Sequence, residues 1–270
     1  MGNYLYGSTP PASTLSTRRY GYIPDIYDHR DHIITFKKTS KTITEHRIEM
    51  PPVRNQGTLG ACTAFAVTAS YEHCAIKENL TDFAPSQLYV YWNERSLSGT
   101  TDSDSGSSIR NSIKTAAKFG VAANTLWPYI TNKYTVKPPL TCYQFGARHK
   151  VLAYYKLQKN VEQIKKAISL EHTVNFGFTV TESFETTGAD GIMPAPSRKV
   201  LGGHAVVICG YDDAKRQFTI QNSWGKDWGD RGFFYMPYDF AVSKYCSDFW
   251  MITFIQNESV HRGPQENHPV

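Results

Sequence analysis

Hydrophobic periodicity changes along the chain, from helical spacing in the first half to strand-like spacing in the second. Residues 62–79 carry apolar side chains with helical period and a broad apolar face, which predicts a buried helix. A second helix is expected to begin near Pro85, and a third to cover residues 109–120 with Gly120 at its C-terminal end. A short helix is expected over residues 161–172.

Strand-like segments dominate the second half of the chain. They cover residues 173–180, 204–212, 217–222, 232–238 and 249–255. Helices gathered in one half and strands in the other are typical of an α+β protein. We therefore expect an α+β fold with two lobes and a cleft between them.

The two ends of the chain differ in composition from its centre. Residues 1–23 are rich in Ser, Thr, Pro and Gly and are expected to form an N-terminal arm. The polar residues 256–270 are expected to be a disordered tail. The globular domain would then cover residues 24–255, with one lobe at about 50–140 and the other at about 141–255.

Charge and hydropathy favour a protein that binds neither nucleic acid nor membrane. The formal net charge is +5, but Lys and Arg are scattered, so a solvated basic surface is favoured over nucleic-acid binding. No apolar stretch approaches the length of a membrane span, and the N-terminus lacks the apolar core of a signal peptide. A cytoplasmic location is expected.

The cysteine pattern argues against a metal site. There are five cysteines, Cys62, Cys74, Cys142, Cys209 and Cys246. They form no C-x-x-C pair and do not have the spacing of metal ligands, so neither a metal nor an organic cofactor is expected. Reduced thiols are typical of an intracellular setting.

Cys62 lies at the start of the first predicted helix, in the segment QGTLGACTAFA. A helix N-terminus lowers the pKa of a thiol, and the thiolate is the nucleophilic form. Gly57 and Gly60 permit a tight turn before it, and Gln56 could stabilise an oxyanion together with the Cys62 backbone N–H. Alternatively, Cys62 is a small buried residue and Gln56 a surface amide.

Two further segments favour the catalytic interpretation of Cys62. His204 begins a strand-like run after two glycines, in LGGHAVVICGYDD. Asn222 ends the next strand, in QNSWGKDWGDRGFF, and could fix the tautomer of His204 by a hydrogen bond. Cysteine, histidine and an orienting amide are the components of a nucleophilic triad.

These three segments together resemble the papain-like cysteine peptidases, the cathepsins included. QGTLGACTAFA resembles the family's Q-G-x-C-G-S-C-W-A-F segment, GGHAVVICGYD its H-A-V-x-x-x-G-Y, and QNSWGKDWGDRGFF its N-S-W-G-x-x-W-G-x-x-G-Y. The resemblance covers roughly residues 24–255 and implies a helical left lobe, an antiparallel β-barrel-like right lobe and an active site between them.

The resemblance implies a role for each matching residue. Cys62 would be the nucleophile, His204 its proton partner in a thiolate–imidazolium pair, Asn222 the residue that orients His204, and Gln56 part of the oxyanion hole. The substrate-binding residues implied in the same way are Gly106, Ser107, Ile109, Gly203, Ala205 and Trp224. Among these, the resemblance gives Gly106 and Ser107 the backbone that pairs with substrate, and Trp224 the shielding of the Asn–His hydrogen bond.

Some positions depart from the family pattern. Leu59 stands where secreted members keep a disulfide cysteine, Thr63 replaces the tryptophan after the nucleophile, and Gly203 replaces the common Asn or Asp. No proton-transfer group is lost by these changes. The pattern is closer to bacterial or viral intracellular members, so a virion or host-delivered location is a further expectation, with secretion by another route left open.

The implied activity is hydrolysis of peptide bonds in a peptide or protein, by a monomer. Many family members are zymogens, so residues 1–23 could be a short propeptide that inhibits the cleft; a disordered leader is the alternative. An acyltransferase or isopeptidase with the same triad, and a non-catalytic binding protein on the same fold, remain as alternative functions.

Overall fold

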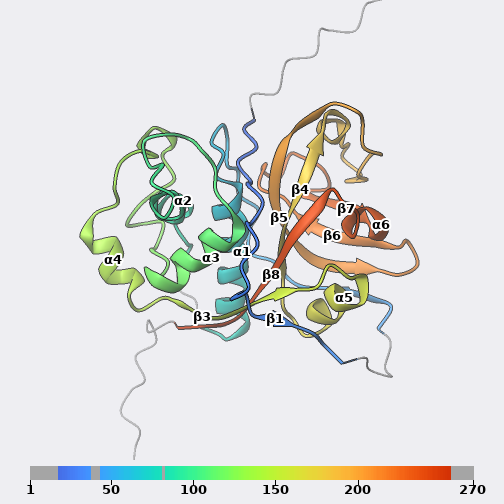
Figure 1. Cartoon of the computed structure of the whole chain (residues 1–270), viewed down its shortest axis with the longest axis horizontal. Coiled ribbons are helices and arrows are strands. Elements are labelled where there is room, and N and C mark those ends of the chain that lie inside the picture. Colours follow the sequence, from blue (N-terminus) through green and yellow to red (C-terminus); the bar gives the residue numbers. More distant parts are fainter. Residues whose placement is uncertain (1–17, 38–42, 81–82, 257–270) are drawn as a thin grey trace, which may run out of the picture.

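The computed structural model describes residues 18–37, 43–80 and 83–256. Most of the predicted arm and the predicted tail after Gln256 therefore lie outside the described residues. The described chain forms a helical lobe and a sheet-containing lobe that face each other across helix α1 (Figure 1).

Side-chain caps mark the start of some of the helices. The α-helices are α1 Cys62–Lys77, α2 Gln87–Ser96, α3 Ile109–Lys118, α4 Leu140–Gly146, α5 Val161–Ser169 and α6 Tyr238–Ala241. Ser86 and Ser108 cap α2 and α3 by accepting hydrogen bonds from the backbone N–H groups of Tyr89 and Asn111. Beyond α3, Gly120 has φ of 75°, the left-handed conformation that was predicted for the end of this helix.

The strands form one mixed sheet in the second lobe. They are β1 Ile33–Ile34, β2 Glu45–Arg47, β3 Val151–Leu157, β4 Val174–Thr181, β5 Val200–Asp212, β6 Gln217–Gln221, β7 Phe233–Pro237 and β8 Cys246–Ile255. Their order is β1-β3-β8-β4-β5-β6-β7, with β2 added to β5. Every named pairing is antiparallel except β1 with β3, which is parallel. The expected α+β fold is confirmed.

Helix α1 lies between the two lobes and is therefore buried on nearly every side. It packs against α2 and α3 in the helical lobe and against β5 and β8 of the sheet. Thirteen of its sixteen residues are buried, which explains the broad apolar face seen in the sequence. Its first residue, Cys62, is thereby placed at the boundary between the lobes, in one hydrophobic cluster with Leu88 of α2 and Ala205 of β5.

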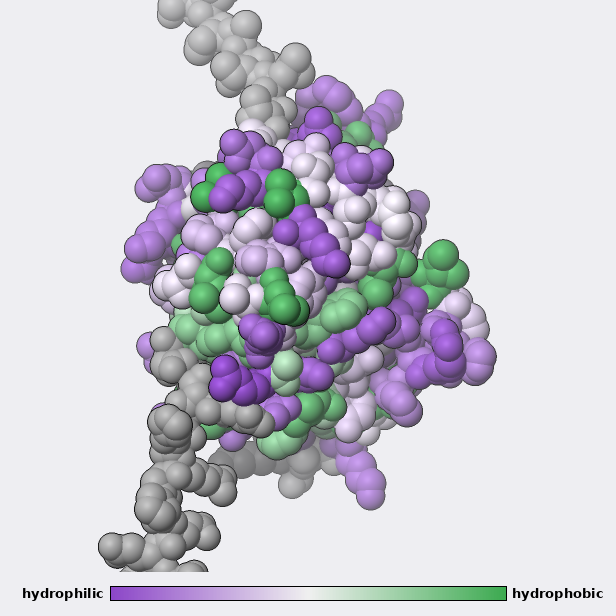
Figure 2. All heavy atoms as spheres, turned by 90° about the vertical axis from the view of Figure 1, so that its left-hand side faces the viewer, coloured by the Kyte–Doolittle hydropathy of each residue, from purple (hydrophilic) through white to green (hydrophobic). Residues whose placement is uncertain are grey.

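The outer face of the helical lobe mixes hydrophilic and hydrophobic residues (Figure 2). Leu140 at the start of α4 is 70% exposed, and Leu126 and Ile130 are partly exposed nearby in sequence. Scattered exposed apolar side chains are ordinary for a folded surface. Among the described residues, no helix combines the length and hydropathy needed to cross a membrane.

Candidate active site

Cys62 is fully buried at the N-terminus of α1. Gly57, with φ of 59°, makes the tight turn before it. Burial raises the pKa of the Cys62 thiol to about 12, and this effect is opposed by hydrogen bonds from backbone N–H groups of Ala205 and Gly21. The thiol therefore lies beside the residue that follows His204, across the boundary between the lobes.

His204 lies on β5, Asn222 directly follows the neighbouring strand β6, and the two are joined by a hydrogen bond. The distance between His204 Nε2 and Asn222 Oδ1 is 2.7 Å. The backbone N–H of Ser223 also donates to Asn222 Oδ1, at 2.8 Å. Because a backbone N–H can only donate, Oδ1 is the acceptor and His204 must carry its proton on Nε2. The other ring nitrogen, Nδ1, is then the basic atom of the neutral imidazole.

The surroundings of His204 exclude water. Its ring stacks on Trp224, with 4.9 Å between the ring centres and 25° between the planes. Nδ1 has no hydrogen-bond partner within the described part of the chain. Burial lowers the pKa of His204 to about 4, although the hydrogen bond to Asn222 opposes this. In this arrangement both Cys62 and His204 favour their neutral forms, in contrast to the ion pair expected from the resemblance.

Gln56 is held by both lobes. Its Nε2 donates to Leu59 O at 2.9 Å and to Arg19 O at 3.4 Å, while its Oε1 accepts from Ser223 Oγ at 2.6 Å. Ser223 therefore fixes which end of the amide donates. The donor end of Gln56 faces backbone carbonyl groups, as an oxyanion hole requires.

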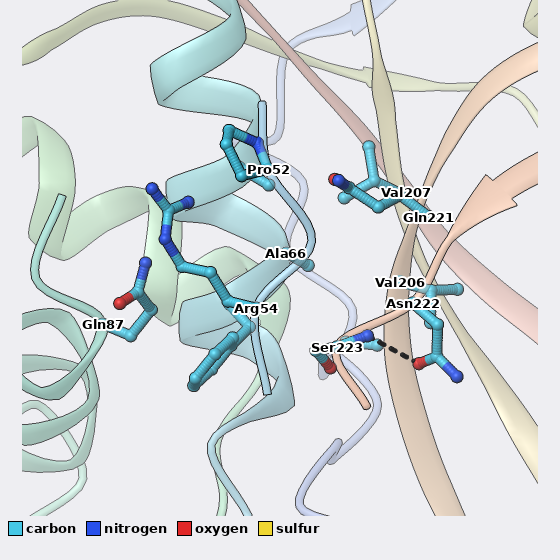
Figure 3. A pocket seen from close by; sticks show the side chains of 12 residues that line it. Pro52, Arg54, Ala66, Gln87, Val206, Val207, Gln221, Asn222 and Ser223 are labelled. Carbon is cyan, nitrogen blue, oxygen red and sulfur yellow. Dashed lines mark hydrogen bonds between the residues drawn. The ribbon is translucent and has the colours of Figure 1, made fainter. Parts of the chain in front are cut away.

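A small cavity adjoins this site (Figure 3). Its volume of about 20 Å³ is enough for one water molecule. It lies between Ala66 of α1, Val206 of β5 and Asn222, which directly follows β6, and Figure 3 shows the Asn222 amide turned toward the backbone of Ser223. The cavity is too small for a peptide side chain.

Residues 18–23 of the predicted arm run through the boundary between the lobes, and pair with residues expected to bind substrate (Figure 1). Ser107 donates its N–H to Gly21 O at 2.8 Å and accepts from Ile23 N at 2.9 Å, and Gly203 O accepts from Tyr22 N at 3.0 Å. These contacts form two isolated parallel β-bridges, one between Gly21 and Gly203 and one between Tyr22 and Ser107.

Glycines make this close approach of the arm possible. A Cβ at Gly106 would lie 2.0 Å from Gly21 O, and a Cβ at Gly21 would lie 1.8 Å from Gly60 O. Gly106 also has φ of 70°. Ile109 and Ala205 are fully or almost fully buried and belong to the same hydrophobic cluster as Tyr22.

The arm also contacts the histidine side of the site. Arg18 lies over the Trp224 ring, 4.5 Å from its centre, and donates to Glu185 at 2.9 Å. Tyr20 meets the rings of His204 and Trp224 edge-on. The arm therefore covers the thiol, the imidazole and the tryptophan at once.

Sequence reasoning missed Ser223, although it directly follows Asn222 in the N-S-W motif. It placed Tyr22 in the predicted arm but did not foresee the contact of this residue with Asp248, which joins opposite ends of the chain: Tyr22 donates its hydroxyl proton to Asp248 Oδ2 at 2.5 Å. All five cysteines are unpaired, in accord with the loss of the family's disulfide positions.

Comparison with known proteins identifies the family of this arrangement. The model of the papain family cysteine protease domain matches residues 39–247, more than half of the chain. An uncharacterized peptidase C1-like protein of Acanthamoeba polyphaga mimivirus is 36% identical, and the match covers 95% of this chain and 94% of that one. Chymopapain of Carica papaya is 25% identical over 79% of this chain, but the match spans only 61% of that protein.

A solved structure has the same architecture. Xylellain, a cysteine protease from Xylella fastidiosa, superposes with a TM-score of 0.84 at 33% sequence identity. The match covers 87% of this chain and 96% of the xylellain chain.

Proposed function

The chain belongs to the papain family of cysteine proteases, and from this premise we propose that it hydrolyses peptide bonds with Cys62, His204, Asn222 and Gln56. The observation that carries the assignment is the hydrogen bond between His204 Nε2 and Asn222 Oδ1. It leaves Nδ1 of His204 as the basic atom, in the residue next to Ala205, whose N–H contacts the Cys62 thiol.

The proposed reaction proceeds in two stages. In the first, Nδ1 of His204 takes the thiol proton and Cys62 Sγ attacks the peptide carbonyl carbon. Gln56 Nε2 and the backbone N–H of Cys62 hold the oxyanion, and the imidazolium then protonates the leaving amine as the C–N bond breaks. In the second, His204 takes a proton from water, whose hydroxide attacks the thioester and releases the acid and the free thiol.

We propose further that residues 18–23 keep the enzyme inactive. The arm supplies a carbonyl, Arg19 O, to Gln56, where the carbonyl of a substrate would bind, and a backbone N–H, from Gly21, to the Cys62 thiol, where the substrate carbon would be attacked. It also removes water from the site, and the same burial raises the Cys62 pKa and lowers that of His204. Departure of the arm would rehydrate both groups and favour the charged pair.

Hydrolysis of an internally quenched peptide library tests this function. Gly21→Val should displace the arm, because the Cβ alone overlaps Gly60 O, and the full-length variant should turn over peptides faster than the wild type. Adding Cys62→Ala should abolish turnover, and adding Asn222→Ala should lower kcat/KM about 100-fold, since the imidazole is no longer oriented. Turnover that survives Cys62→Ala would refute the assignment.

A further inference from the structure

The turn before the nucleophile has no side-chain cap of its own. Helix α1 begins at Cys62, and Ala61 at the N-cap position has no side-chain group that could cap it. A side-chain cap would place an oxygen beside the Cys62 N–H, which the proposed reaction needs for the oxyanion. Leu59 stands where secreted family members keep a disulfide cysteine, and all five cysteines are free. The turn is therefore held without a local cap and without a covalent link.

Asp104 supplies a contact to this turn from the loop between α2 and α3. Its carboxylate accepts a hydrogen bond from Gly60 N, which lies 3.0 Å from Oδ1 and 3.2 Å from Oδ2. Gly60 precedes Cys62 by two residues, so this bond fixes the peptide units that lead into the helix. Only 7% of the Asp104 side chain is exposed. A hydrogen bond to a carboxylate that is shielded from water is among the stronger ones in a protein.

Tyr91 of α2 orients the carboxylate of Asp104. Its hydroxyl group donates to Asp104 Oδ1 and accepts from Gly106 N at 3.3 Å. The Tyr91 side chain is buried, and burial raises its pKa far above the usual range, so the hydroxyl group keeps its proton and acts as the donor. One hydroxyl group thus connects the carboxylate that holds Gly60 to the end of its own loop.

Arg95 fixes the loop that carries Asp104. Its side chain is fully buried, and Nη1 donates to Thr101 O at 3.0 Å and to Ser103 O at 2.7 Å. Nε donates to Tyr91 O at 3.1 Å, within the same helix. The residue before Asp104 is therefore bonded to a buried side chain of α2, and the carboxylate is presented to the turn in one position.

Arg19 of the arm also contacts Asp104. Its Nε lies 3.6 Å from Oδ2, but the Arg19 side chain is 66% exposed, so this ion pair contributes little. The bonds of Asp104 with Gly60 and Tyr91 do not involve the arm. They are therefore available to the open enzyme as well as to the covered one.

We propose that Asp104 is a positioning residue of the oxyanion hole, which holds the turn of residues 56–62 so that Gln56 Nε2 and the Cys62 N–H converge on one oxygen. The inference rests on the proposed function of Cys62. Asp104 acts through Gly60 and contacts no reacting atom. Without it the turn would relax, and the steps that form an oxyanion would slow while the thiol and the imidazole stay in place.

The experiment compares two reactions of Cys62 in full-length Gly21→Val protein, in which the arm is displaced. Hydrolysis of a quenched peptide passes through an oxyanion, whereas alkylation by iodoacetamide forms the S–C bond and expels iodide without one. Asp104→Ala removes the acceptor, Asp104→Asn keeps an oxygen acceptor, and Tyr91→Phe removes only the donor that orients the carboxylate. The matched control is Asp102→Ala, at an exposed aspartate of the same loop.

Asp104→Ala should lower kcat at least about 10-fold and change KM less than about 2-fold, because only transition-state binding is weakened. Iodoacetamide should modify Cys62 of this variant as fast as that of its Gly21→Val parent. Asp104→Asn should recover most of kcat, and Tyr91→Phe should lower kcat by less than Asp104→Ala does. Asp102→Ala should leave kcat unchanged.

An unchanged kcat in Asp104→Ala, an Asp104→Asn variant as slow as Asp104→Ala, or alkylation that slows in step with kcat would each overturn this role. If Asp104→Ala does not fold, Tyr91→Phe decides, and an unchanged kcat in that variant overturns the role. Failure of the proposed function gives a different result, because Gly21→Val protein with Asp104 intact would then hydrolyse no peptide.

Discussion

Ser223 determines much of the chemistry at the candidate active site although it holds no reacting atom. Its backbone N–H fixes the oxygen of Asn222, and its hydroxyl fixes the oxygen of Gln56. One residue therefore orients both the amide that sets the His204 tautomer and the amide that we propose holds the oxyanion.

Ser223→Ala should lower kcat in the Gly21→Val background about 10-fold with little change in KM, because only the Gln56 hydrogen bond is lost. The backbone bond to Asn222 remains. Steady-state kinetics on one quenched peptide measures the effect. The control is Ser243→Ala, at a half-buried serine in the turn before β8, which should not change kcat. A change confined to KM would contradict this role.

Glu94 is a second buried titratable group near the nucleophile. It is fully buried on α2 and accepts a hydrogen bond from Thr63 Oγ1 at 2.7 Å. Burial raises the pKa of its carboxyl to about 8. Thr63, which stands where the family pattern has a tryptophan, thus gives the buried carboxyl group a hydrogen-bond donor.

The raised pKa makes a pH-dependent contribution to stability. Between about pH 4.3, where an exposed glutamate titrates, and pH 8, folded Glu94 keeps a proton that the unfolded chain has released. Its contribution is therefore complete at low pH and lost as the pH rises through 8. Relative to Glu94→Gln, the wild-type free energy of unfolding should fall by on the order of 1 kcal/mol per pH unit from pH 5 to 8.

Urea unfolding at several pH values checks this dependence on Glu94. The control is Glu182→Gln, at an exposed glutamate, which removes only a surface ion pair with Lys199. Its free energy of unfolding should change with pH in the same way as that of the wild type. If the free energies of unfolding of the wild type and Glu94→Gln changed with pH in the same way, Glu94 would be ionised in the folded chain.

At the scale of elements, the end of α3 is fixed by close backbone packing. Gly120 has φ of 75°, and a Cβ there would lie 1.7 Å from the carbonyl oxygen of Gly146 at the end of α4. Gly99 has a similar φ of 69°, but a Cβ there would meet no atom within 4 Å. The two glycines separate the cost of conformation from the cost of contact.

Gly120→Ala should therefore destabilise the protein by more than about 2 kcal/mol, and Gly99→Ala by only about 1 kcal/mol. Chemical denaturation of the two variants beside the wild type gives both values. Equal decreases in the free energy of unfolding would mean that the contact between Gly120 and Gly146 can adjust to a Cβ atom without destabilising the protein. The backbone conformation alone would then require glycine at position 120.

Elements with local signals could be predicted from sequence. The period of residues 62–79 and the cap at Ser108 are local, and α1 and α3 begin where those signals lie. The short strands β1 and β2 lie in a stretch that is strand-like in sequence, but each pairs with a partner far along the chain, β3 or β5. Their parallel or antiparallel pairing could not be read from the sequence for this reason.

The same distinction applies to the candidate site. Cys62, His204 and Asn222 lie in motifs that carry their own signature, and the structure brings them to one boundary. The contact of Tyr22 with Asp248 has no such signature, because it depends on how the arm is placed in the whole molecule. The predicted tail lies outside the described residues, and the lobe limits and the monomeric state stay predictions.

At the scale of the whole molecule, arm displacement should control thiol reactivity. With the Cys62 pKa raised to about 12, the thiolate fraction in the closed protein rises about tenfold per pH unit across pH 7–10. The rate at which iodoacetamide modifies wild-type Cys62 should therefore also rise about tenfold per pH unit. Cys62 of Gly21→Val should react at least 10 times faster than that of the wild type at pH 7. Gly188→Val, whose Cβ meets no atom closer than 3.4 Å, should behave as the wild type.

Intact-mass measurement after treatment with an epoxysuccinyl thiol-protease inhibitor shows most directly whether Cys62 is the nucleophile of a cysteine peptidase covered by its own arm. We predict one adduct on Gly21→Val protein, mapped to Cys62 and lost in Gly21→Val/Cys62→Ala, with little on the wild type. An adduct that persists in the Cys62→Ala protein, or an unmodified Gly21→Val protein, would contradict the account.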